Sequence, residues 1–399
     1  MTAVDDTLTP IDPRAYPLLA EAGFGADLFN PTQHRACELV EAYAVHQAIA
    51  VARALELGAM LTAPRSAGEL LADAGFVPSF ARGLAWLLAR LTDADLLVRS
   101  ADADLVAAGE HRYSLRSTLP EPELAAIRDA GLRTDGAYEP AYDLLDATAA
   151  AYPRVARGET TGERALLARA GLWARYFTNT NPYYAINNRV AARAAVARLT
   201  ADAAVLELGA GLGSATEALL DELALPGTIA SLRSYRATEP VAVFGRRAQR
   251  LLDASHPGAP LEFSDLDLNA PWAEQAVRPA SVDLLWGVNV FHLARDLDAV
   301  LHDAHTSLAP GGWLIVGEGL RPQADAVVGA EFPFQLLASF ADVRLDPETR
   351  PTPGFLTAEH WLAAFARAGF ADVEVVPDVI ALRAYYPGFL AGAICGRRP

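Results

Sequence analysis

The sequence predicts an α/β protein with a mostly parallel sheet in its C-terminal half and a mainly helical N-terminal half. After residue 200, apolar strand candidates alternate with helical segments of about ten to fifteen residues, as in a parallel sheet covered on both faces. Before that point, apolar residues recur at helical spacing. A glycine-rich turn follows the first strand of the C-terminal half, and this half is therefore the candidate for catalysis.

Composition narrows the functional classes. The 399 residues, 52% of them hydrophobic, suffice for two or three domains with buried cores. No apolar run approaches the roughly 20 residues of a membrane span, and no basic start precedes one, so we expect a soluble, cytoplasmic protein. Cys37 and Cys395 cannot build a disulfide framework or a cysteine-based zinc site. A net charge of −16 disfavours nucleic acid as a partner and favours small neutral or cationic substrates.

The N-terminal segments are predicted in the order helix, turn, helix and two-stranded wing. A long amphipathic helix covers 33–57, Ser66 caps a short helix, and another helix covers about 78–91. Strands at 96–99 and 112–115 flank an Asp/Ala/Gly turn. This order is typical of a winged helix. Because the second helix carries few positive charges, packing, including packing against a second copy of the chain, is favoured over DNA binding.

The middle of the chain is predicted to be helical over 121–175, with breaks at Gly131, Pro153 and Gly158. The segment after it is dense in aromatic and amide side chains. We expect it either to fold over a bound ligand or to pack as an interdomain helix. The predicted domains are a helical winged-helix-like domain at 1–120, a helical bridge or lid at 121–199, and a catalytic domain at 200–399.

Seven strands are predicted in the C-terminal half. The candidates are 203–208, 236–239, 261–264, 281–289 and 312–316, with 372–378 and 391–397 closing the sheet as a hairpin. Open α/β sheets bind ligands beyond the carboxyl ends of their parallel strands. Side chains that directly follow these strands are therefore the candidate site residues.

The strongest local signal is the run ELGAGLGS, in which a strand ends at Glu207 and glycines stand at Gly209, Gly211 and Gly213. Glycine permits positive φ and a close approach to a ligand, and a helix that opens near Ser214 offers unpaired N–H groups. The spacing departs from the dinucleotide fingerprint, and Glu207 would repel a pyrophosphate but accept a cationic ligand. The turn therefore indicates a positively charged nucleoside.

This run resembles the first motif of class I methyltransferases that depend on S-adenosylmethionine (SAM), and further matches extend the resemblance over about 200–399. The resemblance implies SAM as the cofactor and a Rossmann-like, mostly parallel, seven-stranded sheet. It also implies that Glu239 accepts the ribose hydroxyls. The adenine contact is implied for Asp265 with Leu266, or for Asp267 with the apolar residue after it.

The fourth strand places Asn289 and His292 at the carboxyl edge of the sheet, where Asn289 is a further cofactor-binding candidate. An imidazole titrates near neutrality, so His292 is suited to accept a proton from the attacking group. The stretch HLARD resembles the region of small-molecule O-methyltransferases whose histidine is the general base.

We read 331–361 as part of a substrate wall. The predicted substrate and lid residues are Tyr176, Phe177, Asn181, Tyr183, Tyr184, Asn188 and Phe334.

The leading hypothesis is methyl transfer from SAM to oxygen, nitrogen or carbon of a small molecule, with His292 as catalytic base. The composition suits bacterial natural-product biosynthesis, and resemblance to the dimerisation module of O-methyltransferases implies a homodimer. No metal is predicted, because His302 and His305 share a helical face without a third ligand.

Three other hypotheses remain open from the sequence. One keeps SAM without methyl transfer, either closing its aminobutyrate arm into an azetidine-type ring or steering a pericyclic step. Release of methylthioadenosine instead of S-adenosylhomocysteine (SAH) would identify attack on the arm. The others are a winged-helix DNA-binding regulator and a nicotinamide-dependent oxidoreductase, which DNA binding and stabilisation by NAD would reveal.

Overall fold

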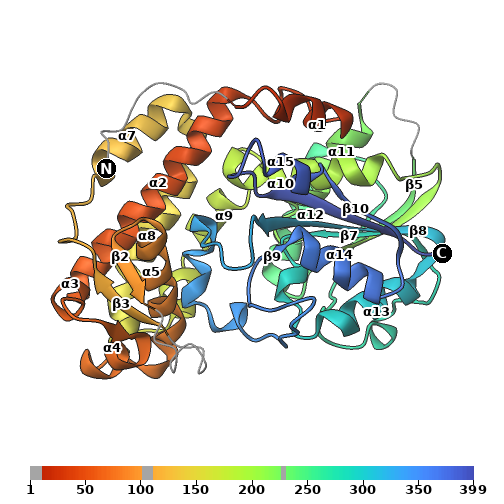
Figure 1. The fold of residues 1–399 in the computed structure, drawn as a ribbon. Helices are drawn as coiled ribbons and strands as arrows, with labels where there is room; N and C mark the ends of the chain where they lie inside the picture. The colour runs from red at the N-terminus through yellow and green to blue at the C-terminus, as the bar shows by residue number, and fades with distance from the viewer. Residues whose placement is uncertain (1–10, 101–110, 226–230) are drawn as a thin grey trace. The chain divides into compact units, whose positions relative to one another are not determined.

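The computed structural model describes residues 11–100, 111–225 and 231–399 (Figure 1). These residues form two compact units. The first unit contains Thr32–Tyr176 and Val327–Phe340, and the second contains 11–31, Phe177–Ala326 and Ala341–Pro399. This division differs from the predicted segments 1–120, 121–199 and 200–399, because parts of the chain that are distant in sequence share one core.

The first unit is mainly helical. Its helices are α2 (Pro31–Ala54), α3 (Leu57–Met60), α4 (Ala67–Asp73), α5 (Ala81–Asp93), α7 (Leu124–Thr134), α8 (Glu139–Ala156) and α9 (Ala170–Tyr176). A small antiparallel sheet has the order β1-β3-β2, with strands β1 (Arg65–Ser66), β2 (Leu97–Ser100) and β3 (Arg112–Leu115). The predicted helices and both predicted strands are thus present, with β1 as an additional strand. The predicted Asp/Ala/Gly turn between β2 and β3 lies largely outside the described residues.

Ser66 caps α4 as predicted. Its hydroxyl accepts from the backbone N–H of Glu69 at 3.1 Å, and the Glu69 carboxylate accepts from the N–H of Ser66 at 2.8 Å. This reciprocal pair satisfies two N–H groups that an isolated helix start leaves unpaired.

Two of the predicted helix breaks are wrong. Gly131 lies inside α7, where an added Cβ would stand 1.9 Å from the Tyr142 hydroxyl, so glycine serves close packing there and not a turn. Pro153 lies in the last turn of α8, and the helix continues past it to Ala156. Only Gly158, with φ +72°, follows a helix end as predicted.

The segment Val327–Phe340 belongs to the first unit through aromatic packing. The ring of Phe332 stacks on Trp86 and on Tyr152, with centroids 5.0 and 4.7 Å apart. Arg82 donates to the carbonyl of Gln335 at 2.9 Å, which anchors the same segment. The predicted insertion 331–361 is therefore shared between the two units.

The second unit is built on a mixed sheet that has eight strands among the described residues. The strand order is β10-β11-β8-β7-β4-β5-β6, with β9 pairing β8 off this path. The strands are β4 (Ala203–Leu208), β5 (Leu232–Thr238), β6 (Leu261–Ser264), β7 (Val282–Val288), β8 (Leu308–Arg321), β9 (Leu356–Thr357), β10 (Ala371–Val376) and β11 (Ala391–Arg397). Only the pairs β10–β11 and β11–β8 are antiparallel. The expected seven strands thus form the path, and β9 is an eighth.

Helices cover both faces of this sheet (Figure 1). They are α1 (Ala15–Glu21), α10 (Pro182–Val196), α11 (Ser214–Leu223), α12 (Ala242–Ser255), α13 (Leu297–Ser307), α14 (Ala358–Arg367) and α15 (Val379–Leu382). Every residue of β4 is buried, which explains its continuous apolar run in the sequence. In the described part of the chain, no helix combines the length and apolar character that a membrane crossing requires.

Candidate active site

The turn after β4 depends on three glycines in the left-handed conformation, with φ values of +63° at Gly209, +55° at Gly211 and +86° at Gly213. An added Cβ would stand 2.5 Å from Val290 Cγ2 at Gly209 and 2.9 Å from Leu252 Cδ1 at Gly213. At Gly211 the nearest such contact is 3.9 Å away. The turn is therefore packed from behind at two glycines and open at the third, which lets a ligand approach its backbone.

Glu239 lies directly after β5 and faces the glycine turn. Its carboxylate accepts from the backbone N–H of Gly211 at 3.0 Å and from that of Val241 at 2.9 Å. Burial raises the pKa of Glu239, and the nearby Asp265 carboxylate raises it further against these hydrogen bonds. Glu239 and Asp265 therefore lie close together at the carboxyl edge of the sheet.

Glu207 is fully buried beneath the turn. Its Oε2 accepts from the hydroxyls of Thr216 at 2.7 Å and Tyr235 at 2.5 Å, and Trp286 donates to the Tyr235 oxygen at 3.0 Å. Oε1 is buried and has no hydrogen-bond partner within the described residues. Burial raises the pKa of Glu207 to about 7. A buried carboxylate with one unpaired oxygen under an open glycine turn fits a cationic nucleoside.

Replacing Glu207 by glutamine should remove a pH-dependent loss of stability. Folding raises the pKa of this carboxyl from its ordinary 4.5 to about 7, so the unfolded chain gives up the proton first. Stability is consequently lost as pH rises between these values, by about 3 kcal/mol in total. We expect urea unfolding at pH 5 and pH 8 to show that loss in the wild type and not in Glu207→Gln.

The matched control for this measurement is Glu262→Gln, which removes an exposed carboxylate on strand β6 of the same sheet. It should retain the wild-type difference between the two pH values. Equal differences in the wild type and in Glu207→Gln would contradict the assignment of this pH dependence to Glu207.

His292 and Glu318 form a buried pair at the ends of β7 and β8. His292 lies in the turn Phe291–Leu293 and is 6% exposed, whereas Glu318 is fully buried. The Glu318 carboxylate meets His292 Nδ1 at 2.7 Å and accepts from the His292 backbone N–H at 3.2 Å. Because an ionised carboxylate has no proton to give, Nδ1 carries the hydrogen and the lone pair lies on Nε2. The arrangement suits His292 to act as a general base.

The sequence predicts His292 but no role for Glu318. Parallel pairing of Val288 with Gly317 brings the two residues together across neighbouring strands. The sequence signal that could have predicted this role is the position of Glu318 near the end of β8, the strand next to the one that His292 follows. The Phe355 ring lies edge-on to the imidazole, with centroids 5.2 Å apart, and was not predicted either.

The asparagine-rich bridge ties α10 to the site. Asn179 donates to the carbonyl of Ser214 at 2.8 Å, and Asn188 donates to the Asn179 side-chain oxygen at 2.9 Å. Asn187 donates at 3.0 Å to the side-chain oxygen of Asn289, which follows β7 with φ +54°. Asn188 and Asn289 thus join networks that position the start of α11 and the end of β7.

The predicted lid residues fall in both units. Tyr176 and Phe334 belong to the first unit, where each packs near Trp173, with centroids 6.2 and 6.0 Å apart. In the second unit, Phe177 and Tyr184 make an edge contact at 5.0 Å. The predicted lid residues that belong to the second unit are Phe177, Asn181, Tyr183, Tyr184 and Asn188.

Tyr184 is close enough to both Glu207, beneath the glycine turn, and Glu318 to interact electrostatically with each of them. Burial raises the pKa of Tyr184 to about 12, a hydrogen bond with Ser214 lowers it, and the negative charges of Glu207 and Glu318 add to the rise. Asn181, on the same bridge, is fully buried at the start of α10. Tyr184 is therefore the predicted lid residue whose surroundings connect both parts of the site.

The two candidate adenine ligands have different environments. Asp267 accepts from the backbone N–H of Asn269 at 2.9 Å and is engaged in its own loop. Asp265 is exposed, faces Glu239 and makes no hydrogen bond or ion pair within the described residues. Leu266 is 2% exposed and packs in the core of the second unit.

Over the same described residues, no group of three or more His, Cys, Asp or Glu side chains gathers as metal ligands would.

Comparisons with known proteins agree with this geometry. Residues 206–314 match a family described as methyltransferase domain. The highly reducing polyketide synthase valA of Aspergillus terreus is 29% identical over 242 residues, which cover 58% of this chain and 9% of that protein. The chain thus spans less than a tenth of the length of this curated relative.

Two solved structures share the fold over nearly the whole chain. The CurJ carbon methyltransferase has a TM-score of 0.75 at 19% identity, covering 97% of this chain and 99% of the other. The trans-methyltransferase CalH, crystallised with SAH, has a TM-score of 0.63 at 20% identity, covering 91% and 90%.

The matched segment begins in β4 and ends in β8, so it spans the glycine turn, Glu239 and His292. These residues stand at the carboxyl edge of the sheet, and the open backbone and buried carboxylates there fit SAM as the cofactor. Residues 206–314 are therefore a methyltransferase domain of the SAM-dependent type, and the chain shares its fold with solved carbon methyltransferases.

Proposed function

We propose that this enzyme methylates an acidic carbon, specifically the α-carbon of a β-ketoacyl chain of the polyketide type. The buried pair of His292 and Glu318, 2.7 Å apart, carries this proposal. A carbon between two carbonyl groups is acidic enough to lose its proton to an imidazole that a carboxylate orients. The carbon methyltransferase among the similar folds and the polyketide synthase among the relatives support the same acceptor class.

The residues of the second unit divide the work. The glycine turn and Glu239 would hold the nucleoside, and Glu207 would face its positive charge. When bound, SAM supplies an electrophilic methyl group and leaves as SAH. His292 Nε2 accepts the α-proton, and the C–H electron pair forms the nucleophilic enolate. Glu318 stabilises the resulting imidazolium through Nδ1, and the proton then passes to water.

The test uses SAM with a labelled methyl group and a 3-oxobutanoyl thioester as acceptor. We expect one label on the α-carbon and one equivalent of SAH. The 2,2-dimethyl analogue, which has no α-proton, should remain unmodified. Label on oxygen or nitrogen would contradict carbon methylation, and release of methylthioadenosine would contradict methyl transfer itself.

We propose that Asp265, and not Asp267, contacts the adenine amino group. Asp265 stands beside Glu239 with its carboxylate unengaged, whereas Asp267 is held by its own loop. Asp265→Ala should raise the Kd for SAM by about tenfold, the expected loss for one hydrogen bond to a charged acceptor. Calorimetry with SAH checks this, and Asp267→Ala is the control. The reverse order of the two effects would assign the contact to Asp267.

The homodimer, the winged-helix role of the first unit and the cytoplasmic location stay predictions. Helices α4 and α5 and the small sheet are the elements that a winged-helix module uses. The polyketide synthase relative is fungal, so a bacterial pathway rests on composition alone. Light scattering of the purified chain would give the oligomeric state.

A further inference from the structure

A buried arginine holds the turn that carries the catalytic histidine. Arg350 is 1% exposed, and its guanidinium donates to the backbone carbonyls of His292 and Ala294. These two carbonyls flank the end of the turn Phe291–Leu293. Arg350 comes from a segment more than fifty residues further along the chain, so its contact with the turn is a product of the fold.

The segment that carries Arg350 is fixed before it reaches the turn. Asp346 and Arg350 exchange backbone hydrogen bonds of 2.9 and 2.8 Å, which closes a tight loop. Arg344 donates its backbone N–H to the carbonyl of Arg295 at 2.6 Å. This contact does not need the Arg344 side chain, whose ion pair with Asp296 is exposed to solvent and contributes little. The loop is thereby attached to the chain directly after the catalytic turn.

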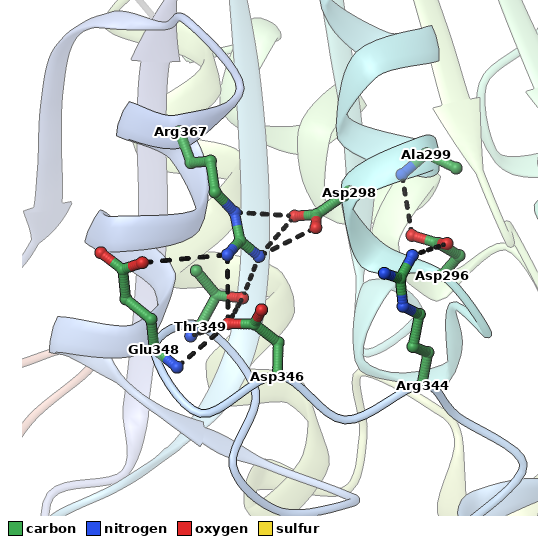
Figure 2. Close-up of polar contacts among 8 residues, drawn as sticks. All are labelled: Asp296, Asp298, Ala299, Arg344, Asp346, Glu348, Thr349 and Arg367. Carbon is green, nitrogen blue, oxygen red and sulfur yellow. Dashed lines mark hydrogen bonds and ion pairs between the residues drawn. The ribbon is translucent and has the colours of Figure 1, made fainter.

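A second set of contacts fixes the loop to α14 and α13 (Figure 2). Arg367 of α14 pairs with Asp298 at 2.7 Å and with Asp346 at 3.1 Å. The Asp346 carboxylate also accepts from the backbone N–H of Thr349 at 2.9 Å, next to Arg350. Because these contacts fix the backbone that leads into Arg350, its side chain enters the core from a preformed position.

The charges around the catalytic pair are few and identifiable. Glu318 uses one carboxylate oxygen on the backbone N–H and the other on Nδ1 of His292. Burial lowers the pKa of Arg350 to about 10, and the charges of Glu318 and Asp296 oppose this fall, so the guanidinium stays protonated at neutral pH. The Tyr184 hydroxyl is neutral there because burial raises its pKa to about 12. Arg350 is thus the cation that balances buried Glu318.

We propose that Arg350 is a positioning residue for the general base: it fixes the backbone of His292 and opposes a second proton on the His292–Glu318 pair. This inference rests on the proposed function, in which His292 accepts the proton. Glu318 holds the backbone N–H and Nδ1 of His292, and Arg350 holds the carbonyl. The backbone N–H, the backbone carbonyl and the ring of His292 are therefore all held by these two side chains.

The test compares Arg350→Gln and Arg350→Lys with Arg344→Ala, which breaks an exposed ion pair in the same loop. Arg350→Gln should lower kcat by about 10- to 100-fold while the KM for the acceptor and the Kd for SAM stay within about twofold. Loss of the cation should also move the acid limb of the kcat profile to higher pH. Arg350→Lys should keep that limb in place but still lower kcat, because an ammonium cannot reproduce the forked donors. Arg344→Ala should match the wild type.

Histidine signals in ¹⁵N NMR separate this inference from the proposed function, because they need no acceptor. His292→Gln assigns the signal among the eight histidines. In Arg350→Gln the titration of the His292 ring should move to higher pH, and in Arg344→Ala it should not. This shift without carbon methylation would support Arg350 and overturn the proposed function.

Three results would overturn the role of Arg350. They are an unshifted His292 titration in Arg350→Gln, a kcat within twofold of the wild type, and an equal loss of kcat in Arg344→Ala. Circular dichroism establishes that each variant is folded. Where the glutamine variant does not fold, the lysine variant decides, and a wild-type kcat in it would also overturn the proposal.

Discussion

Replacing His292 by glutamine is expected to lower kcat for methyl transfer by about 10²- to 10⁴-fold, the usual contribution of a positioned general base. Glutamine fills similar space but cannot accept the proton, so the pair with Glu318 loses its chemical role. The glycine turn is a separate part of the site, and the Kd for SAM should therefore stay close to that of the wild type. Steady-state kinetics with the thioester acceptor and calorimetry with SAH measure the two quantities.

The matched control is His302→Gln on α13, because His302 is an exposed histidine of the same unit and lies outside the His292–Glu318 pair. Its kcat should equal that of the wild type. A His292→Gln enzyme that turns over normally would remove the base assignment, and with it the role proposed for Arg350.

Gly209→Ala is expected to abolish most SAM binding, with a Kd raised by about 100-fold or more. A left-handed backbone costs an L-residue about 1–2 kcal/mol before any contact is counted. The new Cβ would also stand 2.5 Å from Val290 Cγ2, between the glycine turn and the catalytic turn. Both turns must move to admit it, so kcat should fall together with affinity.

Gly258→Ala separates backbone strain from this clash. Gly258 has φ +91°, but no atom lies within 4 Å of an added Cβ. It should lose stability and keep its affinity for SAM. The double variant Gly209→Ala with Val290→Ala removes the clashing carbon and should regain part of the affinity. Equal SAM affinity in Gly209→Ala and Gly258→Ala would show that the contact with Val290 is unimportant.

The parts of the fold that were predictable are those that bury continuous apolar runs. The bounds of β4 and β11 agree with the sequence-based ranges, because buried strands leave nearly uninterrupted apolar segments between turns. The bounds of β6 also agree, although none of its residues is buried. The glycine turn was predictable for a similar reason: a strand, closely spaced glycines and a helix start are all local features. The sheet and its ligand edge thus follow from short stretches of sequence.

The missing half of the site depends on contacts between distant segments. Glu318 lies 26 residues from His292 and Arg350 lies 58 residues from it. No periodicity or spacing connects such residues before the strands and the loop are placed. Gly131 was misjudged for the same reason, since its need for a hydrogen in place of a side chain comes from Tyr142 on another helix. The chemical role of a single side chain such as His292 was therefore easier to predict than the residues that it contacts.

The interleaved course of the chain limits how the enzyme can be dissected or grafted. A fragment that starts at residue 200 would lack α1, Phe29 and α10, whose apolar side chains complete the core of the second unit. It would also carry Val327–Phe340 without the helices on which that segment packs. Engineers who wish to transplant this methyltransferase into another protein should move residues 11–399 as one piece, because no single cut releases the methyl-transferring half intact.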